Sequence, residues 1–450
     1  MIRIGNGQGF WGDLPDGPVR LAEEGPLDYL TMDYLAEVTM SIMQKQRARN
    51  PELGYAREFH PVMERVLPLC RDRGLRVVSN AGGVNPRGCA RALAAVARRL
   101  GVAGLKIGVV LGDDILGRLD EFLAAGETLA SMDTGGPLSS IRSRVTSANV
   151  YFGAAPVAEA LAAGCHVVVA GRVTDTALVL GPMIREFGWA ADDYDRLAAG
   201  IIAGHIVECG AQVTGGNFQG GWREVPDFAG IGFPVLEAEP DGTFVVTKHP
   251  GTGGRVDVRT VKEQLLYETG DPRRYITPEV TADFTSIRLE PAGPDRVRVS
   301  GIRGGPPTSS YKVSVSYFDG YKCIGQLTYG WPDALDKARA ADGILRERLR
   351  RLGLSFEAVH TEFLGYSACH GPLAHPIAEP NEVVLQVGVR TPDEAAAERF
   401  GREFIALLLT GPPTVTGFGA GRPRPSEVIA YWPALLPKER VSPVVEIEEV

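Results

Sequence analysis

The sequence predicts an α/β protein, with a largely parallel, doubly wound sheet in its N-terminal half and a C-terminal α+β sandwich domain. In the first half, short apolar runs are continuous rather than alternating, which is typical of strands buried on both faces of a parallel sheet. Each run is followed by a loop and then by a helix pattern of roughly ten residues or more. A closed barrel of parallel strands is the alternative architecture for this pattern.

The elements of the first half follow one another in a regular order. The expected strands are Ile2–Gly5, Leu27–Leu35, Leu75–Ser79, Leu105–Leu111 and Cys165–Ala170. The expected helices are Met40–Arg49, Phe59–Arg73, Pro86–Leu100, Pro156–Ala163, Thr176–Phe187 and Leu197–Glu208. Parallel sheets bind ligands at the carboxyl ends of their strands, so the polar and glycine-rich residues that follow these strands are the first candidates for a site.

The last third of the chain predicts a separate unit. Two expected strands, Tyr311–Phe318 and Tyr321–Tyr329, are joined by Asp319-Gly320, which is a hairpin signal. The remaining expected elements are a helix at Asp333–Leu352, strands at Phe356–Gly365 and Glu382–Val389, a helix at Pro392–Leu409 and a strand at Ser426–Trp432. We therefore expect an α/β domain at 1–240, a Gly/Pro-rich connecting and site-forming segment at 241–310, and an α+β domain at 311–450.

Composition excludes several classes of protein. Over 450 residues, 44% are hydrophobic and 23% charged, which is ordinary for a globular protein, and the net charge of −8 disfavours a nucleic-acid partner. The six cysteines are scattered without a CxxC pair, as in a reduced cytoplasmic protein. No apolar run approaches the roughly 20 residues of a bilayer span, so we expect no membrane partner.

The N-terminal glycine loop is the first candidate site. Gly5-Asn6-Gly7-Gln8-Gly9 follows the first expected strand, and its spacing is not that of a GxGxxG nucleotide fingerprint. A tight structural turn and a substrate-binding loop both remain open. In the second interpretation, Gly7, Gly9 and Asp13 contact the substrate.

Two further strand ends carry polar residues. Asn80, Gly82, Gly83 and Asn85 precede a helix N-terminus, which attracts anions, although turn and capping chemistry explain the same residues. Asp113 lies in a Gly-Asp-Asp sequence that caps a helix, contacts a substrate or, with further ligands, holds a metal.

Gly171-Arg172-Val173-Thr174-Asp175 points more clearly to a ligand. A guanidinium has the planar geometry that suits a carboxylate or phosphate, and Arg172 ends a buried apolar strand, where packing alone does not favour it. Asp175 is expected to orient this arginine or to cap the next helix. A structural ion pair is the alternative.

Two later stretches supply groups for acid/base chemistry. Glu208 and Asn217 lie close together in the sequence with Cys209, which is more often a small core residue than a nucleophile. The second stretch is a glycine-rich loop that begins with a histidine, the commonest general base, and a polar surface loop is its alternative interpretation. The residues expected to bind substrate there are Thr252, Gly253 and Arg255, beside His249.

Taken together, these motifs resemble the acyclic terpene utilisation AtuA family over about residues 1–430. The segments that carry the resemblance are Ile4–Asp13, Leu27–Met40, Asn80–Pro86, Ala170–Asp175, Glu208–Phe218 and His249–Gly254. Longer relatives carry an extra small C-terminal domain, which we do not expect here. The resemblance implies a place in the breakdown of branched, terpene-derived acids as coenzyme A thioesters, and it supplies no agreed catalytic residues.

From the resemblance and these residues we expect an enzyme that adds or removes water on an acyl-CoA or related carboxylate. His249 and Glu208 are the expected acid/base pair, and Arg172, Arg255 and the N–H groups of loops 80–83 and 251–254 are expected to hold the anion. Carbon–carbon lysis of a hydroxyacyl thioester and a non-catalytic ligand-binding subunit are the alternatives. We expect no required cofactor or metal, and we expect a homo-oligomer.

Overall fold

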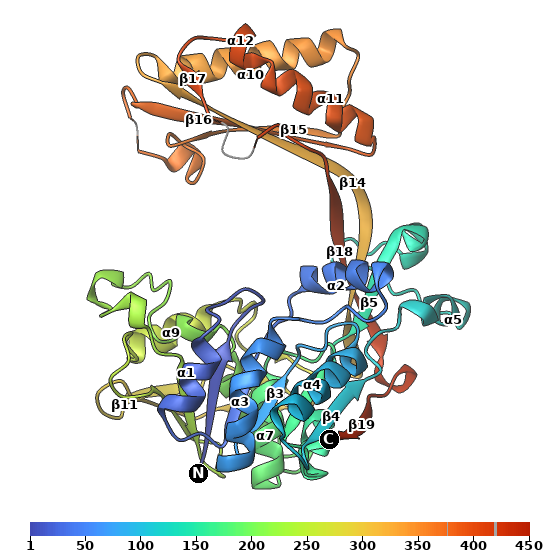
Figure 1. The fold of residues 1–450 in the computed structure, drawn as a ribbon, viewed down its shortest axis with the longest axis vertical. Helices are drawn as coiled ribbons and strands as arrows, with labels where there is room; N and C mark the ends of the chain where they lie inside the picture. The colour runs from blue at the N-terminus through green and yellow to red at the C-terminus, as the bar shows by residue number, and fades with distance from the viewer. Residues whose placement is uncertain (376, 418–420) are drawn as a thin grey trace. The chain divides into compact units, whose positions relative to one another are not determined.

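A computed structural model describes residues 1–375, 377–417 and 421–450. The chain forms two compact units, the first made of Met1–Ser316 and Tyr431–Val450 and the second of Tyr317–Ala430 (Figure 1). The sequence predicts 311–450 as one domain. The last twenty residues instead return to the first unit, because the strand Val444–Glu449 pairs with an edge strand of its sheet.

The first unit is built on a ten-stranded sheet whose central strands are parallel. From one side to the other they are β1 (Ile2–Gln8), β2 (Tyr29–Met32), β3 (Arg76–Ser79), β6 (Val167–Ala170) and β4 (Lys106–Leu111). These are the strands that the sequence predicts, and their continuous burial on both faces agrees with the continuous apolar runs.

Antiparallel strands extend this sheet on both sides, so the sheet is mixed rather than largely parallel. Beyond β1 lie β7 (Pro234–Ala238), β8 (Phe244–Lys248), β12 (Val297–Ser300) and β11 (Arg288–Pro291), and beyond β4 lies β19 (Val444–Glu449). The sheet therefore runs between the two edges β11 and β19. The α/β fold class is confirmed, and the doubly wound arrangement stays a prediction.

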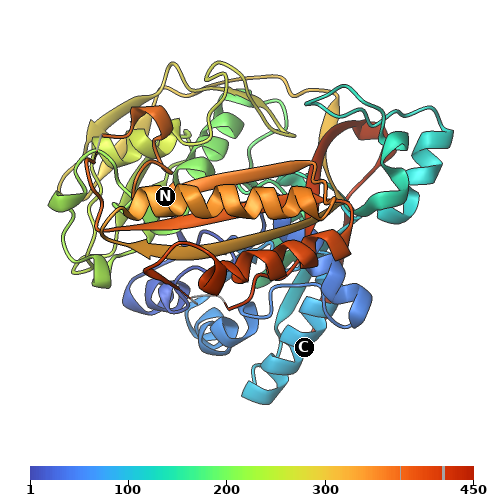
Figure 2. The same cartoon turned by 90° about the horizontal axis from the view of Figure 1, so that it is seen from above.

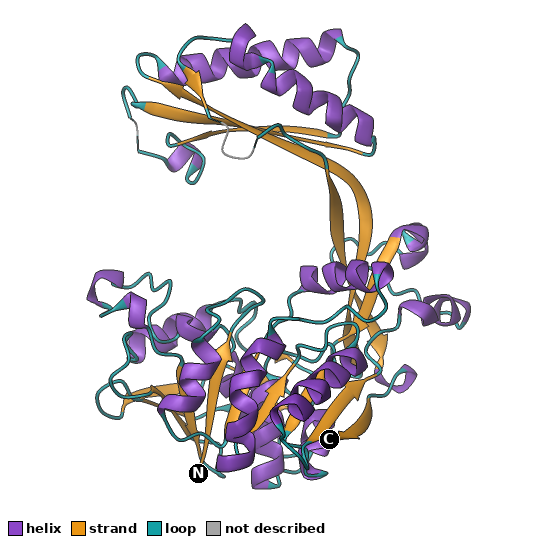
Figure 3. Cartoon of the chain, in the orientation of Figure 1, coloured by secondary structure: helices purple, strands orange, loops and turns teal. Residues whose placement is uncertain are grey.

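Among the described residues, the first unit contains nine α-helices. They are α1 (Gly17–Glu24), α2 (Glu37–Arg49), α3 (Phe59–Arg73), α4 (Pro86–Leu100), α5 (Leu119–Ala124), α6 (Ala155–Ala162), α7 (Ala177–Phe187), α8 (Tyr194–Val207) and α9 (Val258–Leu266) (Figure 3). Of these, α1, α4, α6 and α7 contact the central strands. The sequence predicts α3 and α4 to the residue. At α4, Asn85 accepts a hydrogen bond from the N–H of Gly88, Pro86 opens the first turn, and Gly101 ends the helix with a positive φ of 67°.

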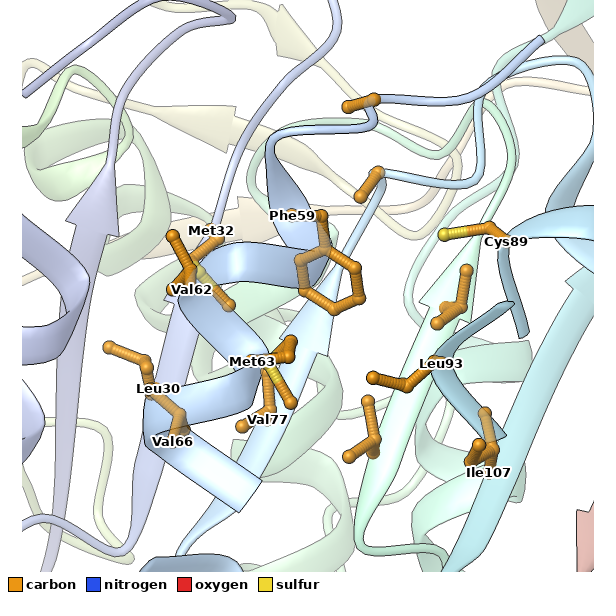
Figure 4. Packing of buried hydrophobic residues seen from close by; sticks show 14 of the residues in the cluster. Leu30, Met32, Phe59, Val62, Met63, Val66, Val77, Cys89, Leu93 and Ile107 are labelled. Carbon is orange, nitrogen blue, oxygen red and sulfur yellow. The ribbon is translucent and has the colours of Figure 1, made fainter. Parts of the chain in front are cut away.

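Alternate residues of the strands face different helices. Leu30, Val77 and Ile107 point toward α3 and α4, where they pack in one buried cluster with Phe59 and Leu93 (Figure 4). Complete burial of a side chain such as Phe59 stabilises the fold by about 1.5–3 kcal/mol.

Residues at the intervening positions contact other helices. The Tyr29 hydroxyl donates to Glu186 of α7 at 2.5 Å. A Cβ added at Gly108 would lie 2.7 Å from the Ala160 side chain of α6. Both observations place α6 and α7 against positions of the strands that the first cluster leaves uncovered.

Strand β1 is longer than predicted and contains most of the expected glycine loop. It continues to Gln8, so Gly5 and Gly7 lie in the sheet. A Cβ at Gly7 would lie 2.5 Å from the Cα of Pro18 in α1. The glycine therefore allows close packing of a helix on the strand, and only the end of the motif, at Gly9, forms a loop.

The segment expected to be a connecting one, 241–310, is folded. It contributes β8, β11 and β12 to the main sheet and also contains α9. A small separate sheet is formed by β13 (Arg303–Gly305), β10 (Thr281–Asp283) and β9 (Tyr275–Ile276). The many glycines and prolines of this segment predict long loops. In the structure many of these residues lie in short turns between the strands.

The second unit is an antiparallel sheet covered by helices, in agreement with the α+β prediction. Its strands are β15 (Ala358–Leu364), β16 (Glu382–Thr391), β17 (Val415–Thr416) and the part of β14 (Ser310–Gly330) from Tyr317 onward. Strand β18 (Ser426–Pro437) also pairs with β14 and belongs to this unit as far as Ala430. Its helices are α10 (Ala334–Arg351), α11 (Glu394–Ile405) and α12 (Leu407–Thr410). Figure 2 shows α10 and α11 side by side across the strands, which present Leu385 and Val387 to them.

The expected hairpin at Asp319-Gly320 is wrong. Strand β14 continues through both residues, and Gly320 has a positive φ of 87° without any reversal of the chain. The part from Tyr321 pairs with β16, whereas β5 (Val145–Val150) and β18 also pair with β14. A hairpin requires the two halves to pair with each other, and here other strands occupy them. The helix expected to begin at Pro392 begins at Glu394, with Asp393 as its cap.

Candidate active site

A cavity of about 490 Å³ opens at the carboxyl ends of β1, β2 and β6. Each strand delivers polar residues to it through the loop that follows, as expected for parallel strands. The lining residues from these loops are Gly9, Phe10 and Asp13 after β1, Asp33, Leu35, Ala36 and Glu37 after β2, and Arg172 and Asp175 after β6.

The ends of α8 and α9 supply the remaining wall. The lining residues there are Glu208, Cys209, Ala211, Gln212, Gly216 and Asn217 after α8, and Tyr267 and Glu268 after α9. The complete lining holds six carboxyl groups, on Asp13, Asp33, Glu37, Asp175, Glu208 and Glu268. We call this space the acidic cavity, because Arg172 is the only basic side chain among these described lining residues.

Arg172 is held rigidly at the wall of the acidic cavity. Its side chain is 3% exposed, and the guanidinium donates to the carbonyl of Leu35 at 2.9 Å and to Asp175 at 2.8 Å. Its guanidinium carbon lies 4.2 Å from the centroid of the Tyr151 ring. Burial alone would lower its pKa, but the negative charges around it, above all Asp175, raise the pKa, so Arg172 stays charged.

Asp33 is a buried carboxyl group in the same wall. Its Oδ1 accepts hydrogen bonds from Asn80 at 2.6 Å and from the N–H of Leu35 at 3.0 Å. Burial raises its pKa well above the ordinary value, and the neighbouring Asp175 raises it further. These effects outweigh the opposing charge of Arg172, so Asp33 holds its proton to higher pH than an ordinary aspartate does.

Glu208, at the end of α8, lines the same cavity as Asp33 and Arg172. Its Oε1 lies 3.0 Å from Nδ1 of His205, one turn earlier on the helix, and the two side chains are 10% and 1% exposed. Burial raises the pKa of Glu208 more than the His205 contact lowers it. The pKa of His205 is also raised, because the charge of Glu208 overcomes the effect of burial.

Glu37 connects the acidic cavity to Tyr151. The Tyr151 hydroxyl donates to Glu37 Oε1 at 3.0 Å, and Lys312 Nζ lies 3.6 Å from the same oxygen. Burial would raise the pKa of Glu37, but a hydrogen bond with its own backbone and the charges of Arg172 and Lys312 outweigh burial and lower it. Glu37 therefore differs from Asp33 and Glu208, whose pKa values are raised.

The structure brings part of the predicted set together. The predicted residues that line the acidic cavity are Gly9, Asp13, Arg172, Asp175, Glu208 and Asn217. Asn80 and Asp113 lie behind them as supports: Asn80 holds Asp33, and Asp113 accepts from the N–H of Arg172 at 2.9 Å. Asn85 caps α4 and Gly7 packs under α1, which are the structural alternatives given for them.

The two loops expected to offer N–H groups to an anion use them internally. The N–H of Gly82 donates to the carbonyl of Ala170 at 3.1 Å, and that of Gly83 donates to Asn80 at 3.2 Å. In the other loop, the N–H groups of Gly253, Gly254 and Arg255 donate to the carbonyls of Gly230, Pro226 and Thr214, respectively. These groups stabilise the loops and do not converge on a common ligand.

His249 and Glu208 are not brought into one cavity. His249 is 2% exposed, and its Nε2 lies 2.9 Å from the carbonyl of Leu21 in α1. Burial lowers its pKa, so the ring favours the neutral form. Its neighbours Thr252 and Arg255 are also engaged, Thr252 with the His249 carbonyl and Arg255 with Glu224 and Asp257. The histidine beside Glu208 is His205.

Asp33, Glu37, His205, Tyr267 and Glu268 are the site residues that sequence reasoning missed. Asp33 directly follows an apolar strand, and Asp113 follows another after one glycine, so the rule that selected Asp113 would have found Asp33 as well. The spacing of His205 and Glu208 at i and i+3 on a helix was a second usable signal. No local sequence pattern identifies Tyr267 and Glu268, the two residues after α9, as site residues.

Two further observations bear on the chemistry. Burial raises the pKa of the Cys209 thiol to about 12, which leaves it protonated near neutrality and disfavours it as a nucleophile. Within 1–375, 377–417 and 421–450, no three His, Cys, Asp or Glu side chains are grouped as metal ligands. In the same ranges, none of the helices combines the length and apolar character needed to cross a membrane.

Comparisons with known proteins place the chain in a family. The model of the acyclic terpene utilisation family protein AtuA matches residues 2–447, nearly the whole chain. No curated protein and no solved structure matches it. The match extends through both compact units, and it includes the loops that line the acidic cavity. The chain therefore belongs to the acyclic terpene utilisation AtuA family.

Proposed function

We propose that this protein is an enzyme of branched, terpene-derived acid catabolism that adds or removes water on an acyl thioester in the acidic cavity. The family is implicated in acyclic terpene utilisation, which is consistent with a catabolic role. The observation that carries the proposal is the presence of two buried carboxyl groups with raised pKa values, Asp33 and Glu208, in one cavity. Such pairs are characteristic of acid/base sites.

The proposed roles follow from the surroundings of each group. Glu208 accepts the proton from the carbon next to the thioester carbonyl, and its raised pKa makes it a stronger base than an ordinary carboxylate. Asp33 donates its proton to the departing hydroxyl group, which leaves as water. Hydration is the reverse, with the two proton transfers exchanged in direction.

Arg172 and His205 support these transfers in the proposal. Arg172 supplies the positive charge toward which the developing enolate oxygen is directed. His205 is a positioning residue, because it holds the carboxyl group of Glu208 through Oε1 and is itself 1% exposed. The pair His205–Glu208 replaces the pair of His249 and Glu208 expected from the sequence.

The charge of the lining favours a thioester over a free acid at the reacting end. Asp33 is the proton donor in this proposal, and the other five carboxyl groups outnumber the single guanidinium, so they would repel a substrate carboxylate, whereas a thioester carbonyl carries no charge. The same repulsion keeps the phosphates of a coenzyme A group outside this cavity. Coenzyme A is therefore proposed as part of the substrate, and no other cofactor is invoked.

The test is turnover of branched 3-hydroxyacyl and 2,3-enoyl thioesters by the purified full chain, followed by absorbance of the conjugated double bond and by product analysis. We expect Glu208→Gln and Asp33→Asn each to lower kcat by about 10²–10⁴-fold. Glu290→Gln, an equivalent change on an exposed strand position, is the control and should leave kcat unchanged.

Each other outcome identifies a rival. Two shorter products in place of water addition would indicate a carbon–carbon lyase, and a rise in Tm with thioesters but no turnover would indicate a binding subunit. Full activity in both Glu208→Gln and Asp33→Asn would overturn the assignment of these two residues.

A further inference from the structure

A second cavity, of about 290 Å³, lies elsewhere in the first unit and has a different character. Three large apolar side chains line it from distant parts of the chain: Met132, Ile276 and Leu435. They are 56%, 51% and 50% exposed. Solvent-exposed apolar groups that gather around a hollow, rather than singly, indicate a surface that a ligand or partner covers.

The lining of this cavity carries one positive charge. Its lining contains Lys312 and no carboxyl group, and we call it the apolar cavity. Lys312 Nζ lies 4.9 Å from the Tyr151 ring centroid, and this side chain is 43% exposed. A second ammonium group, on Lys438, lies 5.4 Å from the ring of Tyr311, another lining residue.

We propose that the apolar cavity binds an aliphatic carboxylate, with its hydrocarbon chain against Met132, Ile276 and Leu435 and its carboxylate at Lys312. An apolar chain removes these three side chains from water, and one negative charge complements the ammonium group. Among the residues that the structure describes, the carboxylate paired with Lys312 is that of Glu37, at 3.6 Å and itself half-exposed. Since both are in solvent, the existing pair contributes little free energy and a ligand carboxylate can replace it.

The apolar cavity is separate from the acidic cavity but shares a wall with it. In the loop after β6, Thr174 lines the apolar cavity, whereas Arg172 and Asp175 line the acidic one. Tyr151, after β5, also lines the apolar cavity. Tyr151 stacks on Arg172 and donates to Glu37. The inference does not rest on the proposed function, because it concerns binding and a different set of side chains.

The test is calorimetric titration of the full chain with decanoate, decanol and acetate. Decanoate should bind best, because it alone combines a long chain with a negative charge. We expect Leu435→Asp to weaken decanoate binding at least about tenfold, since it places a like charge on the apolar wall. Lys312→Met should weaken decanoate binding and leave decanol binding unchanged. Leu409→Asp, at a 96% exposed leucine of the second unit, is the matched control and should bind as the wild type does.

The outcomes separate this site from the acidic cavity. If Leu435→Asp does not fold, as judged by its thermal melt, Ile276→Asp tests the same wall. Glu208→Gln should bind decanoate normally, even if the proposed reaction is absent. The inference is overturned if decanoate does not bind, if Lys312→Met leaves its affinity unchanged, or if Glu208→Gln abolishes binding while Leu435→Asp retains it.

Discussion

The acidic cavity and the apolar cavity lie in the same unit and share the loop after β6, yet they are lined by opposite chemistry. The first holds six carboxyl groups around one buried arginine, and the second holds apolar side chains and one exposed lysine. In the acidic cavity the strand ends fix charged groups in buried positions, which shifts their pKa values. In the apolar cavity the charge stays in solvent and is available to a ligand. Burial shifts the pKa of a charged group and so suits it to proton transfer, whereas an exposed charged group keeps its charge and can attract a ligand. The position of the group therefore matters as well as its residue type.

Among the substitutions that test this comparison, we expect the largest change in the free energy of unfolding at Arg172. Arg172→Met removes the donor to Leu35 and leaves Asp175 without its counter-charge. The carboxylate left behind on Asp175 is 35% exposed and keeps part of its hydration, so we expect the free energy of unfolding to fall by about 1.5–3 kcal/mol. Urea unfolding measures it, with Arg273→Met, at a 76% exposed position, as the control. Equal stability of the two variants would contradict a stabilising role for the buried pair.

A medium effect, dependent on pH, is expected at Asp113. Burial raises the pKa of this carboxyl group to about 7. The folded chain therefore keeps a proton that the unfolded chain releases near pH 4, at about the ordinary aspartate pKa. The contribution of this proton to the free energy of unfolding is fully present below about pH 4 and is lost as the pH rises to about 7.

Asp113→Asn should remove that dependence, because the amide oxygen still accepts from Arg172 and Asn149 but does not titrate. Relative to the variant, the wild type should lose stability between about pH 4 and 7 with a slope of at most about 1.4 kcal/mol per pH unit. Urea unfolding at several pH values measures the difference. Parallel stability curves for the two proteins would show that Asp113 is ionised throughout this range.

The smallest effect is expected at Lys312, in the apolar cavity. Lys312→Met removes an exposed ion pair and should change the free energy of unfolding by no more than about 0.5 kcal/mol. The same urea experiment provides the measurement. A loss as large as that of Arg172→Met would make Lys312 a structural residue and would erase the contrast between the two cavities.

The bounds of helices and strands could be predicted accurately where a single local pattern determines them. The apolar periodicity of Phe59–Arg73 and the capping pattern around Pro86–Leu100 fix both helices without help from the rest of the chain. The Asp319-Gly320 signal failed because strand pairing depends on which partners are present, and β14 pairs with β16 and other strands instead of folding back.

The candidate site was only partly predictable for the same reason. Arg172 and Asp175 were found because strand ends of a parallel sheet converge, and this follows from the fold class alone. His249 was grouped with Glu208 because both residue types suit acid/base work. Its ring instead lies at the carbonyl of Leu21, a contact across more than 200 positions that no local pattern records.

The sequence by itself determined the alternation of buried strands and helices, the family, and the strand ends at which polar residues gather, because these depend on local periodicity and on the order of motifs. Only the tertiary structure decided which carboxyl groups are buried together and that His205, rather than His249, contacts Glu208. It also decided that a second, apolar cavity is lined by Tyr151. Burial and distance between side chains far apart in the chain arise from the packing of whole elements, and these two quantities set the charge state of each group.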